Sequence, residues 1–356
     1  MKSYIWTLPT RVFHWLLALF VLLAFLTDDD ELITYHAIIG YAILILLVFR
    51  VIWGILGPKY SKFSDFVFGI KKSKDYLKNI LSTKQKYIGH NPLASTVMIA
   101  LLIVIFLTII SGILTFGIQE GKGVLSFLNN SFYKEMELFE ELHEILSNFV
   151  IALIVLHLLG VFSDKVLKPR HKTLDSIFTG YKNTKENESV DLNIFQKLIA
   201  LLFLVGLVYF FIFSLSSDKN IFIASKFKPI NYSQENSLFV KECSSCHILY
   251  PPHLLPKKSW KIMMSDLENH FGDDAWIVPE DNKNILSYLL KNSAQYSTKK
   301  ESVGILNSIK NQDIIAITQT DYWKKEHKKI PKTVFNHKDV RSKANCKACH
   351  KDIEKG

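Results

Sequence analysis

Two five-residue motifs contain all four cysteines of this chain. The motifs are Cys243-Ser244-Ser245-Cys246-His247 and Cys346-Lys347-Ala348-Cys349-His350. The C-x-x-C-H spacing is that of a c-type haem attachment site, in which both thiols bond to the porphyrin and the adjacent imidazole becomes an iron ligand. A thioredoxin-like pair or half of a zinc site is the alternative, because metal sites also use Cys and His. Repetition of the motif, with no other cysteine present, favours two covalent haems.

Long apolar segments fill the first two-thirds of the 356-residue chain, which is 49% hydrophobic overall. A bilayer span takes about 20 apolar residues. Five segments reach or approach that length, over residues 11–27, 35–56, 93–117, 141–162 and 195–217. The first is not typical of a signal peptide, because no small-residue cleavage site follows it and an acidic run comes next. We therefore expect a multi-pass membrane protein with a polar C-terminal third.

Basic residues are concentrated in two of the loops between these spans. Between spans two and three lie Lys59, Lys62, Lys71, Lys72, Lys74, Lys78, Lys84 and Lys86, and between spans four and five lie Lys165, Lys168, Arg170, Lys172, Lys182 and Lys185. The positive-inside rule then places the N-terminus and both loops in the cytoplasm. Five crossings put everything after about Ser217 on the outer side, where bacteria attach c-type haem. The net charge of +10 is therefore not interpreted as nucleic-acid binding.

An amphipathic stretch over residues 63–81 lies within the first basic loop. It is expected either along the inner membrane surface or as an ordinary solvated helix.

Four histidines lie within the predicted spans: His14, His36, His143 and His157. An ionisable side chain at membrane depth is a functional hypothesis by default, because its burial is costly. His143 and His157 share one span, and their spacing at about 100° per residue puts both imidazoles on one face. The two are about 21 Å apart along the axis. Matching depths pair His143 with His36 near the outer surface and His157 with His14 near the inner one.

These pairs predict two six-coordinate haems b that are suited to electron transfer. The alternative for any one of these histidines is a satisfied core residue. Arg11 is a candidate partner of a haem propionate at the inner end, with a plain positive-inside flanking charge as the alternative.

The first half of the chain resembles the bacterial di-haem cytochrome b561 family, related to the cytochrome b subunit of nickel-iron hydrogenases. The similarity covers roughly residues 3–182. The residues that carry it are Trp6-Thr7-Leu8-Pro9-Thr10-Arg11-Val12-Phe13-His14-Trp15, His36 with Gly40-Tyr41 and Phe49-Arg50-Val51-Ile52-Trp53-Gly54, Phe63-Ser64-Asp65-Phe66, Gly89-His90-Asn91-Pro92-Leu93, His143, His157 and Thr179-Gly180-Tyr181-Lys182. The resemblance implies a four-helix bundle that binds two haems b and exchanges electrons with quinone or a redox partner subunit. The fifth span is then an additional tether.

The tail resembles the small di-haem cytochrome c domain over roughly residues 239–356. Its matching residues are the first C-x-x-C-H motif, Tyr250-Pro251-Pro252, Leu254-Leu255-Pro256, Ser259-Trp260, Asn269-His270-Phe271-Gly272-Asp273-Asp274-Ala275, Trp323-Lys324-Lys325-Glu326-His327 and the second C-x-x-C-H motif. Each c haem needs a sixth ligand, and the candidates are His253, His270, His327, His337, Met263 and Met264. The resemblance favours His270 and His327, without indicating which haem takes which.

The other candidates have simpler expected roles. Met263 and Met264 lie on a helix expected from Trp260 to His270 and should pack in the domain core. His253 and His337 are expected to be exposed. His90 and His171 lie at the cytoplasmic edge. The alternatives for His90 are a residue of a quinone site, a partner of a haem propionate and an ordinary loop residue.

The predicted fold class is mainly α: a four-helix di-haem b bundle, a fifth transmembrane helix and a small helical di-haem c domain. The expected domains are 1–190, 191–218 and 219–356. The cofactors are two haems b, two covalent haems c and, as an open question, quinone. The partners are quinone or quinol, a periplasmic redox protein and membrane lipid, in a bacterial inner membrane.

Three functions fit these features. The first passes electrons from quinol to a periplasmic acceptor, as a quinol:acceptor oxidoreductase. The second reverses the flow, from a periplasmic dehydrogenase or superoxide to quinone. The third is a haem-based sensor or assembly factor, which requires an open iron site. No nucleophile, general base or phosphate-binding loop indicates another enzyme class.

Overall fold

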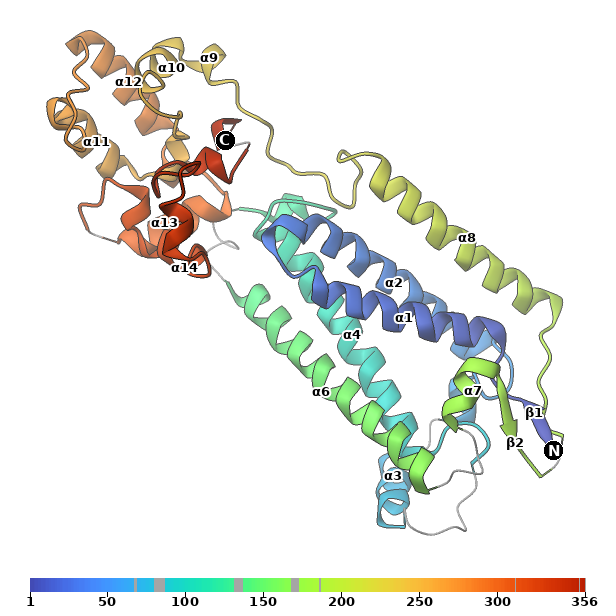
Figure 1. The fold of residues 1–356 in the computed structure, drawn as a ribbon. Coiled ribbons are helices and arrows are strands. Elements are labelled where there is room, and N and C mark those ends of the chain that lie inside the picture. Colours follow the sequence, from blue (N-terminus) through green and yellow to red (C-terminus); the bar gives the residue numbers. More distant parts are fainter. Residues whose placement is uncertain are drawn as a thin grey trace. The chain divides into compact units, whose positions relative to one another are not determined.

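The computed structural model describes residues 1–66, 69–79, 87–130, 137–167, 173–185, 187–310, 312–351 and 353–355. The chain forms two compact units (Figure 1). Unit 1 comprises Met1–Gly117, Lys122–Leu125 and Glu137–Ala224, and unit 2 comprises Ile118–Gly121, Ser126–Met136 and Ser225–Gly356. The predicted mainly helical fold is confirmed.

Among the described residues, five helices are long and apolar enough to cross a bilayer: α1 (Leu8–Leu26), α2 (Ile33–Leu56), α4 (Pro92–Ile118), α6 (Leu138–Leu167) and α8 (Ile194–Ser216). Each begins and ends within three residues of its predicted span, except that α6 continues five residues beyond the predicted end. Apolar length therefore located the spans, as expected when no backbone group can be left unpaired in lipid.

Helix α2 is the most enclosed of the five and packs against both α1 and α8 (Figure 1). Its inward side chains, including Ile38, Leu46 and Trp53, are at most 5% exposed. By contrast, α6 presents outward apolar side chains such as Ile145, Phe149 and Phe162, more than half of each exposed. Such a face costs nothing in hydrocarbon but would be an aggregation hazard in water.

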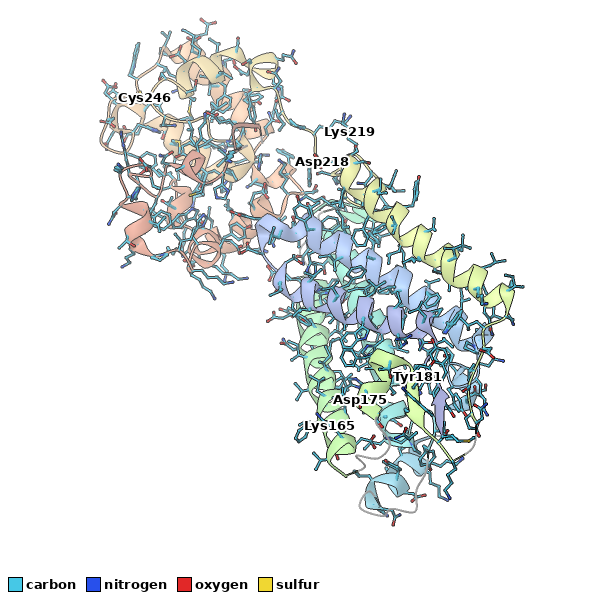
Figure 2. All side chains as sticks on the ribbon, turned by 45° about the vertical axis from the view of Figure 1, so that its right-hand side comes forward. Lys165, Asp175, Tyr181, Asp218, Lys219 and Cys246 are labelled. Carbon is cyan, nitrogen blue, oxygen red and sulfur yellow. The ribbon has the colours of Figure 1, made fainter. Side chains whose placement is uncertain are left out.

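The N-terminus is attached to the segment that follows α6. Strand β1 (Lys2–Tyr4) pairs antiparallel with β2 (Tyr181–Asn183), directly after α7 (Thr173–Thr179). The amides of Ile5 and Trp6 donate to the carbonyl of Gly180, whose φ of +88° favours glycine. Lys165, Asp175 and Tyr181 lie at one end of unit 1, and Asp218 and Lys219 at the opposite end of α8 (Figure 2).

The loop predicted as one amphipathic stretch from residue 63 is divided. A single 3₁₀ turn covers Phe63–Asp65, Phe66 is only 1% exposed, and the described helix α3 spans Gly69–Lys78. The phenyl ring of Phe63 lies so close to α2 that a Cβ at Gly54 would be 2.1 Å from it. Phe66 is therefore a core residue, and the half-buried Phe63 packs against α2. Residues 67–68 and 80–86 lie outside the described residues.

Unit 2 consists of short helices: α9 (Tyr232–Glu235), α10 (Ser237–Cys243), α11 (Lys257–Ser265), α12 (Pro279–Lys291), α13 (Lys300–Ile309), α14 (Asp321–Glu326) and α15 (Lys332–Phe335). Its core contains Phe239, Leu255, Ile285, Leu289 and Ile305, each at most 2% exposed. The compactness of this core is consistent with a small α-helical domain.

Two expectations for unit 2 are wrong. Helix α11 ends at Ser265, where Asp266 adopts non-helical backbone angles, so His270 lies in a tight turn closed by hydrogen bonds with Asp273. His253 is 7% exposed rather than a surface residue, because its Nε2 is 3.2 Å from the Glu301 carboxylate. The expected core packing of Met264 (6% exposed) and the exposure of His337 are confirmed.

Thr320 caps α14, and its removal tests the local stability of this helix. The buried hydroxyl accepts from the Trp323 amide (3.2 Å) and donates to the Ile317 carbonyl (2.7 Å). We expect Thr320→Ala to lower the unfolding free energy of unit 2 by about 1–2 kcal/mol, because a buried amide loses its acceptor. Thr320→Ser, which keeps the hydroxyl, is the control. Differential scanning calorimetry that finds the two variants equally stable would contradict this role.

Candidate haem-binding sites

The eight histidines predicted as iron ligands occur in the structure as four close pairs. The ring-centroid distances are 6.5 Å for His14 and His157, 6.0 Å for His36 and His143, 6.1 Å for His247 and His270, and 6.0 Å for His327 and His350. The first two pairs lie in unit 1 and the last two in unit 2. The pairing by depth proposed for the membrane histidines is thus the pairing that the chain adopts.

The spacing within each pair matches two imidazoles on opposite sides of one metal ion. A metal–imidazole bond is about 2 Å long and the ring centroid lies about 1.1 Å behind the bonded nitrogen, so the centroids of a trans pair are about 6.3 Å apart. No group of three or more His, Cys, Asp or Glu residues with metal-site geometry occurs among the described residues. Two axial nitrogens without further protein ligands fit a porphyrin iron and do not fit a zinc site.

In four of the eight rings the Nδ1 atom is hydrogen-bonded to a backbone carbonyl. The acceptors are Ala24 for His36 (3.0 Å), Thr108 for His143 (2.9 Å), Ile248 for His247 (2.6 Å) and Trp323 for His327 (2.9 Å). A proton on Nδ1 leaves the lone pair on Nε2, which is the nitrogen available to a metal. These hydrogen bonds therefore fix both the tautomer and the ring orientation.

The membrane pairs join α6 to the first two helices. His143 and His157 of α6 face His36 of α2 and His14 of α1 respectively. One helix thus contributes a ring to both sites, at two depths. The Nδ1 atom of His14 is buried and has no hydrogen-bond partner among the described residues.

The pairs of unit 2 come from turns rather than from long helices. His247 follows α10, His270 is in the turn after α11, His327 is the C-cap of α14, and His350 follows a 3₁₀ turn. The structure thereby assigns partners that the sequence left open: His270 is beside the first motif and His327 beside the second. None of the four cysteines is part of a disulfide bond, so all four remain available for the haem attachment that the motifs predict.

Two aromatic residues that the sequence analysis named only as part of the resemblance, with no role of their own, support the c-type sites. The indole of Trp323 stacks on the His327 ring, with centroids 4.3 Å apart and planes 13° apart. The ring of Tyr250 is 5.1 Å from that of His247, and its hydroxyl donates to the Ala344 carbonyl at 2.6 Å. Ala344 is two residues before Cys346, so Tyr250 connects the two motifs. The one-turn spacing of Trp323 and His327 was a usable signal.

Cationic side chains gather at the His14–His157 end of unit 1. Arg50 and Lys182 are each 6% exposed. Arg50 lies over the Phe63 ring at 4.7 Å and donates to the Ser61 carbonyl, while Lys182 donates to the carbonyls of Ile88 and Gly89. Among the described residues no salt bridge joins Arg50 or Lys182 to a carboxylate, although the charge of Asp164 acts on Lys182. Buried cations without a salt bridge are costly, so this end favours an anionic group.

His90 lies within the same cluster, between the rings of Trp6 (4.7 Å) and Phe66 (4.8 Å). Burial, and then the charges of Lys182 and Arg50, lowers the pKa of His90 to about 3. The ring is therefore neutral at pH 7. Its Nδ1 and the Nε of Arg11 are buried without a hydrogen-bond partner in the part of the chain described here. His90 is a loop residue, as expected, but it is enclosed; His171 lies outside the described residues.

The comparisons with known proteins match these two regions. The family model for prokaryotic cytochrome b561 matches residues 5–180, and that for dihaem cytochrome c matches residues 239–356. Among curated proteins, no match was found.

Solved structures of diheme cytochromes c match about a third of this chain. A diheme cytochrome c from Rhodobacter sphaeroides is 34% identical, over 34% of this chain and 94% of that one, with a TM-score of 0.31. A diheme cytochrome type c from Shewanella baltica is 32% identical, over 34% of this chain and 85% of that one, with a TM-score of 0.28.

The motifs, the apolar helices and the two family-model matches agree on the nature of each region. Residues 239–356 belong to the dihaem cytochrome c family and residues 5–180 match the family model for prokaryotic cytochrome b561, and the chain is an integral membrane electron-transfer protein that binds haem b and haem c.

Proposed function

We propose that this protein passes electrons between the quinone pool and a periplasmic redox partner through two haems b and two haems c. The observation that supports this most directly is the set of four imidazole pairs, all spaced for axial ligation of one iron. Haem iron supplies a one-electron couple when bound. The remaining tasks, which are ligation, orientation and control of the local field, belong to the residues of this chain.

In this proposal each residue set has a defined role. His14 and His157 ligate the inner haem b, and His36 and His143 the outer one. Cys243 and Cys246 attach the first haem c, ligated by His247 and His270, and Cys346 and Cys349 attach the second, ligated by His327 and His350. The domains are the membrane bundle (1–190), the fifth helix as a tether (191–218) and the haem c domain (219–356).

The inner basic cluster fits the carboxylates of the inner haem b. Arg50 and Lys182 supply buried cations at that end, and Arg11 and His90 each supply a buried nitrogen without a hydrogen-bond partner among the described residues. Carboxylates placed there would give counter-charges to Arg50 and Lys182. This is a role for Arg11 beyond that of a flanking charge.

The topology follows from charge. The basic loops predict a cytoplasmic N-terminus and a periplasmic haem c domain in a bacterial inner membrane. The close pairing of imidazoles opposes the sensor hypothesis, because a haem held between the two rings of a pair would have no open iron site. Between the two directions of flow, we favour quinol as the donor, because the charges around the two c-type sites favour electron movement towards the site of His327 and His350.

The proposal is tested by reduction with duroquinol. The detergent-purified protein, oxidised and under argon, should show b-type bands first and c-type bands afterwards when followed by stopped-flow absorbance. The order follows because the membrane pairs are the ones placed at lipid depth. Failure of the b bands to reduce would exclude quinol as the donor. Reduction of the b bands from the c side by a soluble donor would instead support the reverse direction.

Replacing one ring in three of the four pairs tests the ligand assignment. We expect His143→Ala and His157→Ala each to remove one haem b without changing the c-haem content, because one imidazole cannot hold a non-covalent haem in six-coordinate form. His327→Ala should keep its covalent haem but lose the low-spin spectrum. His337→Ala, an exposed histidine of the same region, is the matched control. The pyridine haemochrome assay counts b and c haems separately, and four b-plus-c haems in His143→Ala would refute the assignment.

Gly112 tests how closely α4 approaches the outer ligand. A Cβ at Gly112 would lie 2.8 Å from Cε1 of His143, whereas a Cβ at Gly206 of α8 would have no atom within 4 Å. His143 also has its Nδ1 held by Thr108 and Ser111 of the same helix, so the ring has little freedom to move. We expect Gly112→Ala to shift or abolish the spectrum of the outer haem b, and Gly206→Ala to leave it unchanged. Equal spectra for both variants would contradict this packing.

A further inference from the structure

His270 and His327, the two proposed iron ligands of unit 2 that lie outside the C-x-x-C-H motifs, have opposite electrostatic surroundings. Within six residues on either side of His270 there are four carboxylates (Asp266, Glu268, Asp273 and Asp274) and no lysine or arginine. The same window around His327 contains five lysines (Lys324, Lys325, Lys328, Lys329 and Lys332) and two carboxylates. All nine of these named side chains belong to exposed residues.

The positive region extends around the whole second site. Within residues 321–351 the exposed basic residues, here called the basic surface, are Lys324, Lys325, Lys328, Lys329, Lys332, Lys338, Arg341, Lys343, Lys347 and Lys351. Only Asp321, Glu326 and Asp339 oppose them within the described part of that range. Local ion pairs neutralise Lys324 and Lys347, through Asp321 and Glu354.

The stretches that carry these charges meet in space. The Nζ of Lys343 is 5.7 Å from the Trp323 ring, which stacks on His327, and the Phe335 ring is 5.7 Å from Trp323. The His327 ring in turn is 6.0 Å from that of His350. The lysines beside His327, those of residues 332–343 and those beside Cys349 therefore surround a single site, and Cys349 and His350 are exposed residues within it.

We propose that the basic surface is the docking site of an acidic one-electron redox protein, and that the second c-haem site is where electrons leave this chain. This inference rests on the proposed function and specifies its outer partner. The transfer moves one electron from the reduced haem to the oxidised centre of the partner, and no bond forms or breaks.

Charge supports this direction in two ways. A positive surface steers an acidic partner to the exposed site and raises the association rate by roughly 10- to 1,000-fold at low salt. The same charges disfavour the oxidised iron, which carries one more positive charge, while the carboxylates near His270 favour it. The site at His327 and His350 is thus biased towards the higher reduction potential, so an electron arriving at His247 and His270 moves on to it.

An anionic lipid surface is the competing partner for a basic patch. The coincidence of the basic surface with an exposed electron-transfer site favours a redox protein, because lipid contact there would cover the site.

The test uses the full-length protein in phosphatidylcholine nanodiscs, reduced and then mixed with hexacyanoferrate(III) or with the cation cobalt(III) tris(phenanthroline). In the variant Lys324→Gln/Lys325→Gln/Lys328→Gln/Lys329→Gln, we expect oxidation of the c bands by hexacyanoferrate to slow about tenfold at low salt, and oxidation by the cobalt complex to speed up. Poly-glutamate should inhibit hexacyanoferrate oxidation of the parent protein and not of the variant. Spectroscopic titration should show a lower potential for one c haem only.

The control variant removes the same charge elsewhere in unit 2: Lys241→Gln/Lys261→Gln/Lys283→Gln/Lys291→Gln, all exposed residues. It should behave as the parent protein. Equal rates for both variants, with haem content intact, would overturn the docking site while leaving the proposed function in place. A parent protein without a six-coordinate haem at the second motif would instead defeat the proposed function.

A second set of discs, made from equal parts of phosphatidylcholine and phosphatidylglycerol, separates protein from lipid. If the difference between the variant and the parent protein persists there, the basic surface is free to meet a soluble partner. If the difference disappears only in the anionic discs, the lysines are bound to lipid and the proposal is wrong.

Discussion

The constraint on which this structure depends is the fixed distance between two imidazoles of a pair, which we propose to share one iron. Each ring must come from a different element and approach its partner to about 6 Å between centroids, which leaves little tolerance in helix register. Helix α6 meets this requirement twice, once against α1 and once against α2. A rotation of α6 by one residue would move its histidines by about 100° and remove both pairs together. The register of α6 therefore determines both the packing of the bundle and the positions of its histidine pairs.

The hydrogen bonds to Nδ1 show how the chain limits the remaining freedom. A carbonyl such as that of Thr108 or Trp323 is available only where a helix or turn brings it beside the ring. The His143 site needs α4 as well, because Gly112 leaves room for the imidazole where any side chain would collide with it. A third helix thus takes part in a site whose ligands come from two others.

Much of this arrangement could be predicted from the sequence, since it depends on local pattern. Apolar length located the five spans, and the spacing of His143 and His157 on one helix predicted which partners lie at which depth. The rest depended on tertiary contacts that have no local signature. The burial of His253 follows from a carboxylate 48 residues further along the chain. The helix expected to reach His270 ends at Ser265, because turn formation at Asp266 and Asp273 outweighs helix propensity there. Phe66 belongs to a segment whose sequence is amphipathic, but its ring packs against His90 and Arg50.

The two ends of the proposed electron path use cationic groups in opposite ways. At the inner end Arg50 and Lys182 are buried, so their charges act at short range in a low dielectric and require a fixed anion nearby. At the second c-type motif the lysines are exposed, so their field is screened beyond about 10 Å at 0.1 M salt and acts on a partner only when it approaches. Buried cations hold a permanent group with little dependence on salt, whereas exposed ones give a contact that forms quickly and releases quickly. An electron carrier needs the first property where its cofactor resides and the second where its partner must leave after each transfer.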